Sequence, residues 1–188
     1  MTNTVWTSSG KELITLNFRR GEVMRWISIA IVAALSAGAS LALAGGSHLI
    51  STGSIAGGKL GQGRAAYKAA YGKPQPAENL EGGLTRLKYQ SGAIEVYFQT
   101  GASSGRYIVA RNKAFKTSKG VGPCVKGSAV KKAYPSAAKV SLAGGNEFAY
   151  RLGNKLWFDI EAGRVATVAL GVGKQTAFIA SNTPACHL

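Results

Sequence analysis

The segment KAAYG at residues 68–72 returns in altered form as KKAYP at residues 131–135. When Tyr71 is aligned with Tyr134, alanines fall at matching positions before both tyrosines, and a Gly or Pro follows each of them directly. Gly and Pro end helices, and residues four apart share one helical face. Each segment therefore predicts a short helix, and the recurrence predicts that a unit of the chain is duplicated.

Two segments of alternating residues follow the predicted helices. YQSGAIEVYF at residues 89–98 and YRLGNKLWFDI at residues 150–160 both begin Tyr-x-x-Gly and continue with apolar and polar residues in alternation. Alternation at period two predicts a strand with one face on the core. The aliphatic sides of these strands should pack on the helices, and they comprise Ile94, Val96, Phe98, Leu156, Phe158 and Ile160.

This order of elements predicts an α+β fold made of two tandem repeats. Each repeat should be a short helix packed on an antiparallel sheet of three to four strands, with repeat 1 at residues 57–116 and repeat 2 at residues 117–188. A strand over Thr176–Ala180 should close the second repeat. Antiparallel sheets commonly cover one face and leave the other in water, so we expect an open sheet face.

Tyr97 and Trp157 alternate with the aliphatic residues and so belong to the expected open face. Aromatic side chains exposed on a rigid sheet often anchor a partner. Arg106 and Arg164, which each begin a further β-rich run, would add charge complementarity to such a contact. The alternative is that the two aromatic side chains pack where the repeats meet.

The helical segment LGQGRAAYKAAYGKP at residues 60–74 resembles the start of the small-lipoprotein repeat of the outer-membrane barrel assembly machinery. The positions that match its spacing are Gly61, Tyr67, Gly72 and Pro74. The tandem arrangement is similar to that of the secreted β-lactamase inhibitory proteins. This resemblance implies a non-catalytic binding module that recognises other proteins with its sheet face.

Residues 1–44 have the parts of a leader with a signal peptide. A flank with three arginines precedes an apolar stretch that ends in Ala-Leu-Ala at residues 42–44, the pattern of an export signal. A start at Met24 would give a signal of ordinary length, so Met24 is the expected start. We expect a secreted or cell-envelope protein with a flexible linker at residues 45–56. The alternative is an uncleaved leader that anchors an external domain by a single membrane span.

Cys124 and Cys186 are the two cysteines of the chain. A pair of cysteines in an exported protein usually forms a disulfide, which here would join the start of the second helix to the C-terminal tail. Two other interpretations stay open, namely a reactive thiol at a helix N-terminus and two inert thiols.

The sequence offers little for catalysis. It contains no H-E-x-x-H motif, and its histidines, His48 and His187, have no partner nearby in sequence. Asp159 and Glu161 share one side of a predicted strand, but neighbouring cations favour a solvated ion-pair cluster over a catalytic carboxylate pair. We therefore expect no enzyme, no cofactor and no metal site.

Positive charge dominates the composition, with 23 Lys and Arg against 8 Asp and Glu and a net charge of +15. No acidic residue occurs between Glu95 and Glu147. The cations of this interval predict a basic ridge, formed by Arg111, Lys113, Lys116, Lys119, Lys126, Lys131, Lys132 and Lys139. Such a ridge attracts anionic polymers, lipid headgroups or acidic proteins, or it serves solubility alone. Nucleic acid is not the expected partner, since the chain has export features and no recognition motif.

Two functions follow from these patterns. The first is an exported binding or inhibitory module that recognises a protein partner through its sheet face. The second is an envelope-associated structural protein that binds an anionic polymer or lipid headgroups through the basic ridge.

Overall fold

The computed structural model describes residues 3–4, 15–16, 48–142, 148–176 and 179. The chain divides into two compact units, Met1–Leu43 and Ala44–Leu188. In the first unit, strands β1 (Asn3–Thr4) and β2 (Thr15–Leu16) pair antiparallel. Most of the predicted leader lies outside the described residues, so the signal peptide stays a prediction. Within the described part of the chain, no helix is long and apolar enough to cross a membrane.

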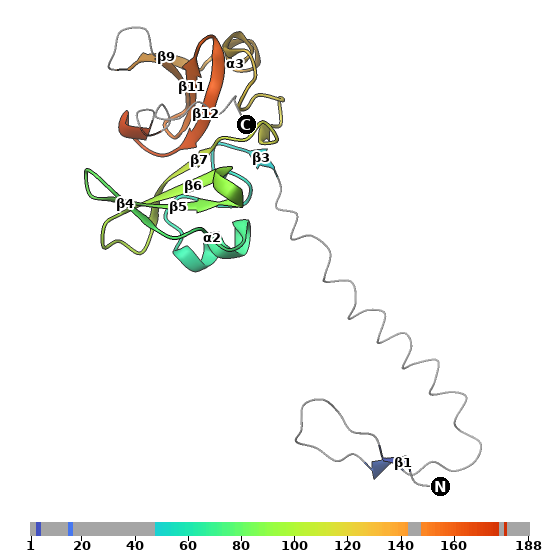
Figure 1. Ribbon diagram of the computed structural model, residues 1–188. Coiled ribbons are helices and arrows are strands. Elements are labelled where there is room, and N and C mark those ends of the chain that lie inside the picture. The colour runs from blue at the N-terminus through green and yellow to red at the C-terminus, as the bar shows by residue number, and fades with distance from the viewer. Residues whose placement is uncertain (1–2, 5–14, 17–47, 143–147, 177–178, 180–188) are drawn as a thin grey trace, which may run out of the picture. The chain divides into compact units, whose positions relative to one another are not determined.

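The second unit is built on one antiparallel sheet of eight strands in the order β4-β5-β6-β7-β12-β11-β10-β9 (Figure 1). The strands are β4 (Glu78–Leu80), β5 (Leu84–Tyr89), β6 (Ile94–Gln99), β7 (Gly105–Ala110), β9 (Ala138–Ser141), β10 (Phe148–Leu152), β11 (Leu156–Glu161) and β12 (Arg164–Leu170). A 3-10 turn, η2 (Gln90–Gly92), joins β5 to β6. The central pairing is β7 with β12, which joins the two sets of four strands. The α+β prediction is confirmed.

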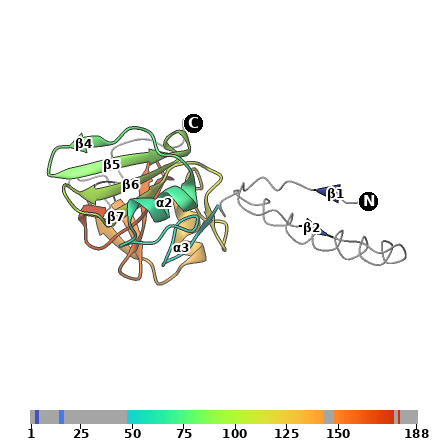
Figure 2. The ribbon, with the colours of Figure 1, turned by 90° about the horizontal axis from the view of Figure 1, so that it is seen from below.

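Two short helices form where the sequence predicts them, as α2 (Arg64–Tyr71) and α3 (Gly127–Ala133). α2 ends at Gly72, whose φ of +88° is a conformation that favours glycine. The Tyr67 ring of α2 meets Phe98 of β6 at 5.9 Å, and Tyr134, directly after α3, stacks on Phe158 of β11 at 5.9 Å. The helices therefore pack on the aliphatic sides of the strands, as predicted, and both are visible over the sheet in Figure 2. We call this side of the sheet the first face.

The flexible linker predicted for residues 45–56 is wrong for the described part of that segment. β3 (Leu49–Ile50) pairs in parallel with β8 (Lys116–Thr117), as a separate two-stranded sheet. Ile50 and Ile55 are fully buried and belong to the core on the first face. Burial of large aliphatic side chains is favourable by about 1.5–3 kcal/mol each, and this ties the Gly/Ser-rich segment down.

The second face of the sheet is also apolar at its centre, so the open face expected for Tyr97 and Trp157 is wrong. Their relative exposure is 3% and 0%, and they form a second core with neighbours from both sets of strands, among them Tyr107, Val109, Ala149 and Ala169. The alternative interpretation, in which the two aromatic side chains pack between the halves, agrees with this arrangement.

The segment after β12 contributes to the second core. Ile179 packs in the second core, and the Tyr107 hydroxyl donates to Gln175 Oε1 at 3.1 Å. Gln175 and Thr176 are helical, so the strand predicted over Thr176–Ala180 is wrong at its start. A chain that returns over the sheet removes the second face from water, which local alternation does not reveal.

Candidate functional site

The four residues expected to bind a protein partner do not form an exposed cluster. Trp157 is buried and its Nε1 donates to the Gly171 carbonyl at 3.1 Å. Arg106 is exposed, donates to Gln99 Oε1 at 3.1 Å and lies over the Tyr107 ring. Arg164 is exposed and donates to the Cys124 carbonyl at 3.0 Å. The two arginines thus serve different local contacts.

Tyr97 is buried on the second face, where its hydroxyl donates to Glu95 Oε2 at 2.5 Å. Burial raises the pKa of Tyr97 to about 12, and the adjacent Glu95 carboxylate adds to the rise. Tyr97 is therefore a neutral hydrogen-bond donor within the structure, and its hydroxyl is already engaged.

Arg111 does not belong to the basic ridge, and this part of the prediction is wrong. The residue directly follows β7, and only 4% of its side chain is exposed. Its Nη2 lies 2.9 Å from Glu95 Oε2. Arg86, on β5, contacts the same Glu95 carboxylate at 3.8 Å and also pairs with Glu78. A buried charge requires a partner of opposite charge, so Arg111 stabilises the protein interior and is not available at the surface.

The other predicted ridge residues are accessible. Lys116 is half-buried and donates to the Pro123 carbonyl at 2.8 Å. Lys139 is exposed on β9, with Nζ 4.1 Å from the centre of the Phe148 ring. The remaining five are exposed, namely Lys113, Lys119, Lys126, Lys131 and Lys132.

Two segments cover the first face of the sheet, residues 48–77 with β3 and α2, and residues 112–137 with β8 and α3. We call them together the helical layer. The first segment has four Lys and Arg, the second has six, and neither contains an Asp or Glu. All ten cations are exposed except the half-buried Lys116.

The sequence reasoning missed the contribution of residues 48–77 to this surface. Their cations are Lys59, Arg64, Lys68 and Lys73. The signal was present, because no acidic residue occurs from His48 to Ala77. Only the fold shows that this acid-free segment covers the same sheet face as the acid-free segment around α3.

The described acidic residues lie elsewhere. Glu78, Glu95 and Asp159 belong to the strands, while Glu81 follows β4 and Glu161 ends β11. Glu78 pairs with Arg86 and with Lys88 Nζ at 2.7 Å. Positive charge is thus concentrated on the helical layer, whereas Glu78 and Glu95 of the sheet are paired with cations.

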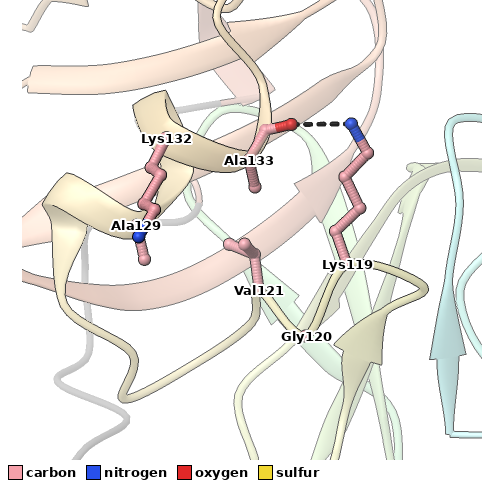
Figure 3. A pocket seen from close by; sticks show the side chains of 6 residues that line it. All are labelled: Lys119, Gly120, Val121, Ala129, Lys132 and Ala133. Atoms are coloured by element: carbon pink, nitrogen blue, oxygen red, sulfur yellow. Dashed lines mark hydrogen bonds between the residues drawn. The ribbon is translucent and has the colours of Figure 1, made fainter.

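A hollow of about 450 Å³ opens on the helical layer between α3 and the loop before it (Figure 3). It is lined by Lys119, Gly120, Val121, Ala129, Lys132 and Ala133. Lys119 Nζ donates to the Ala133 carbonyl at 2.7 Å and lies 4.9 Å from the centre of the Tyr134 ring. In Figure 3 the Lys132 side chain runs along α3 toward Ala129, the direction that a helical Cα–Cβ bond imposes.

The remaining sequence predictions concern the histidines, a metal site and the disulfide. His48 meets the Phe115 ring edge-on at 5.2 Å. Among the described residues no group of three His, Cys, Asp or Glu is placed to hold a metal ion. His187 and Cys186 lie outside the described residues, so the Cys124–Cys186 disulfide stays a prediction.

Comparison of the chain with known protein families, with curated proteins and with solved structures found no match. The resemblance to the small-lipoprotein repeat and to the β-lactamase inhibitory proteins therefore stays an expectation from short motifs. The charge and shape of the helical layer are the features of this protein that bear on its function.

Proposed function

We propose that this protein is a non-catalytic binding protein that attaches to a phosphate-rich anionic surface through its helical layer. One observation carries the proposal: ten cations and no carboxylate occupy the two segments that cover one side of the sheet. A surface of one sign raises the local concentration of partners of the other sign and orients their approach.

The residue types fit phosphate groups on a flexible polymer or a lipid surface. Nine of the ten cations are lysines, with Arg64 as the exception. A lysine ammonium is a hydrated point charge on a flexible stem, and it suits diffuse contacts better than fixed bidentate recognition. Near an anionic membrane each such charge contributes about 1 kcal/mol of attraction.

The charge distribution also favours the helical layer over the sheet as the contact surface. The aromatic side chains once expected to anchor a protein partner are buried in the second core. The strand carboxylates Glu78 and Glu95 are paired with arginines or lysines. An approaching polyanion therefore meets unbalanced positive charge on the helical layer.

The leader predicted for residues 1–44 would bring this surface to the cell envelope, where phosphate-bearing polymers and anionic lipids occur. Export and envelope attachment belong to the proposal.

We further propose that the two helix-and-sheet halves derive from one duplicated unit. Gly61 N–H donates to the Gly105 carbonyl at 2.8 Å, and Cys124 N–H donates to the Val165 carbonyl at 2.7 Å. Gly61 and Cys124 both have positive φ, +80° and +69°, and each lies ten residues before its aligned tyrosine. Similar backbone bonds from aligned donor positions support a shared origin. On this view Cys124 occupies a left-handed position that normally favours glycine.

The proposal is tested by measuring binding of the full chain to phosphatidylglycerol vesicles, to phosphatidylcholine vesicles and to soluble polyphosphate. One variant neutralises three cations of the helical layer (Lys59→Gln, Lys68→Gln, Lys113→Gln). The matched control neutralises three exposed cations outside it (Arg106→Gln, Lys155→Gln, Lys174→Gln).

The layer variant should lose most binding, and the control variant should lose little. Binding should also fall between about 50 mM and about 300 mM salt, because screening shortens the reach of exposed charges. Equal losses in both variants would overturn the proposed surface. Vesicle binding without polyphosphate binding would identify lipid headgroups as the target, and the reverse would identify a soluble polymer.

A further inference from the structure

The hollow beside α3 is lined by two lysines, Lys119 and Lys132, whose ammonium groups lie on opposite sides of it (Figure 3). We infer that this hollow binds one phosphate group together with the small polyol unit that carries it. The inference rests on the proposed function and assigns a specific site within that surface.

The two lysines have the donors that a phosphate group requires. A lysine ammonium carries three N–H donors, and Lys119 uses one of them on the Ala133 carbonyl. That bond, together with the contact to the Tyr134 ring, holds the Lys119 stem at the rim. The second ammonium comes from Lys132 and lies beside Ala129, on the other side of the hollow (Figure 3). Each ammonium can give charge-assisted bonds to the oxygens of a phosphate that enters the hollow.

The shape suits a small unit of a larger molecule. A volume of about 450 Å³ lies in the range of small-molecule sites, and the hollow is open to solvent. Val121, Ala129 and Ala133 line it with small apolar groups, which can contact the carbon atoms of a polyol. A phosphodiester repeat, or the headgroup of phosphatidylglycerol, presents this combination of polyol and phosphate.

The charge arrangement is particular to the second half of the chain. With Tyr71 aligned on Tyr134, Lys131 of α3 matches Lys68 of α2, but Lys132 matches Ala69. A purely solubilising surface gives no reason for the extra lysine to line a hollow. The pair Lys68→Gln and Lys132→Gln therefore provides variants with the same charge change on equivalent helices.

The experiment uses glycerophosphoglycerol, the soluble unit shared by polyol-phosphate polymers and phosphatidylglycerol, as the probe. Its titration into the full chain is followed by amide chemical shifts. The shifts should concentrate at Gly120, Val121, Ala129 and Ala133. Lys132→Gln should raise the Kd of the probe about fivefold, which is the upper range for the loss of an exposed ion pair. Lys68→Gln should leave this Kd within twofold of the parent value.

Equal weakening by Lys132→Gln and Lys68→Gln, or shifts spread over the whole helical layer, would overturn the inference. If polyphosphate and vesicles bind but the probe does not, the proposed function holds and the hollow is not a site. If the probe binds in the hollow but neither polymer nor vesicles bind, the site holds and the proposed function fails. Amide shifts remote from the hollow also report whether Lys132→Gln leaves the fold intact.

Discussion

Arg111 and Glu95 form an ion pair with an Nη2–Oε2 distance of 2.9 Å, and both side chains are almost completely buried. Glu95 lies on β6 and Arg111 directly follows β7, so the ion pair links two neighbouring strands of the sheet. The Tyr97 hydroxyl donates to the same carboxylate oxygen. This cluster removes one of the chain's cations from the surface and uses it in the interior.

Replacing Glu95 by Gln should destabilise the protein strongly. Removing one partner of a buried ion pair leaves the other charge uncompensated, which typically costs about 3 kcal/mol or more. The free energy of unfolding in urea measures the effect. Glu81→Gln, at an exposed carboxylate between β4 and β5, should change it by less than about 0.5 kcal/mol. A comparably small loss for Glu95→Gln would contradict the importance of the Arg111 contact.

Glu78 should contribute to stability in a defined pH range. Hydrogen bonds from Arg86 and Lys88 lower the pKa of Glu78 from 4.5 to about 2. Because the folded-state pKa lies below the unfolded value, the contribution is present above about pH 4.5 and is lost as the pH falls toward 2. The urea concentration at the midpoint of unfolding should therefore fall less over this pH range in Glu78→Gln than in the parent protein.

Lys88→Met provides a second test of the Glu78 contacts. It removes the 2.7 Å ion pair and one of the hydrogen bonds that lower the pKa of Glu78, so the loss of stability in acid should be smaller than in the parent protein and should be complete at a higher pH. If both Glu78→Gln and Lys88→Met lose stability at low pH in the same way as the parent protein, these contacts do not set the pH dependence of stability.

Trp157→Ala should affect stability throughout the domain. The side chain is fully buried and its Nε1 bonds to the Gly171 carbonyl. Truncation of such a residue costs about 3–5 kcal/mol, which calorimetry would register as a large drop in Tm. Val172→Ala is the control, since this side chain is 59% exposed and should change Tm little. A folded, equally stable Trp157→Ala protein would mean that the second core is not closed.

Gly105 should not tolerate a larger residue. A Cβ at this position would lie 2.4 Å from the Tyr67 hydroxyl oxygen, so Gly105→Ala would force Tyr67 away from the Lys59 carbonyl to which it donates at 2.6 Å. Overpacking of this kind costs about 1–3 kcal/mol. Gly53→Ala meets no atom closer than 4.0 Å and should be neutral. Urea unfolding of the two variants distinguishes crowding at Tyr67 from a general effect of glycine replacement.

Local patterns correctly predicted the two helices, the strands β6 and β11, and one face of the sheet. The tyrosine-containing segments form α2 and α3, and the alternation around Val96 and Phe158 assigns these side chains to the core beneath the helices. Such predictions succeed because helical and strand periodicity are properties of neighbouring residues. They do not depend on where the rest of the chain lies.

The candidate site depended on contacts between distant segments. Its acid-free segments are evident in the sequence, but their meeting on one face depends on how α2 and α3 pack. The hollow at Lys119 and Lys132 likewise requires the loop before α3 to fold against the end of that helix.

The sequence by itself determined the two helices, the alternating strands and the excess of positive charge, because each follows from residues that are close together in the chain. Only the tertiary structure decided that Trp157 is covered, that Arg111 is paired with Glu95 and that Ile50 belongs to the core. Burial depends on which remote segment comes to lie over a side chain. The same strand face can therefore be wet or dry without any change in its own pattern.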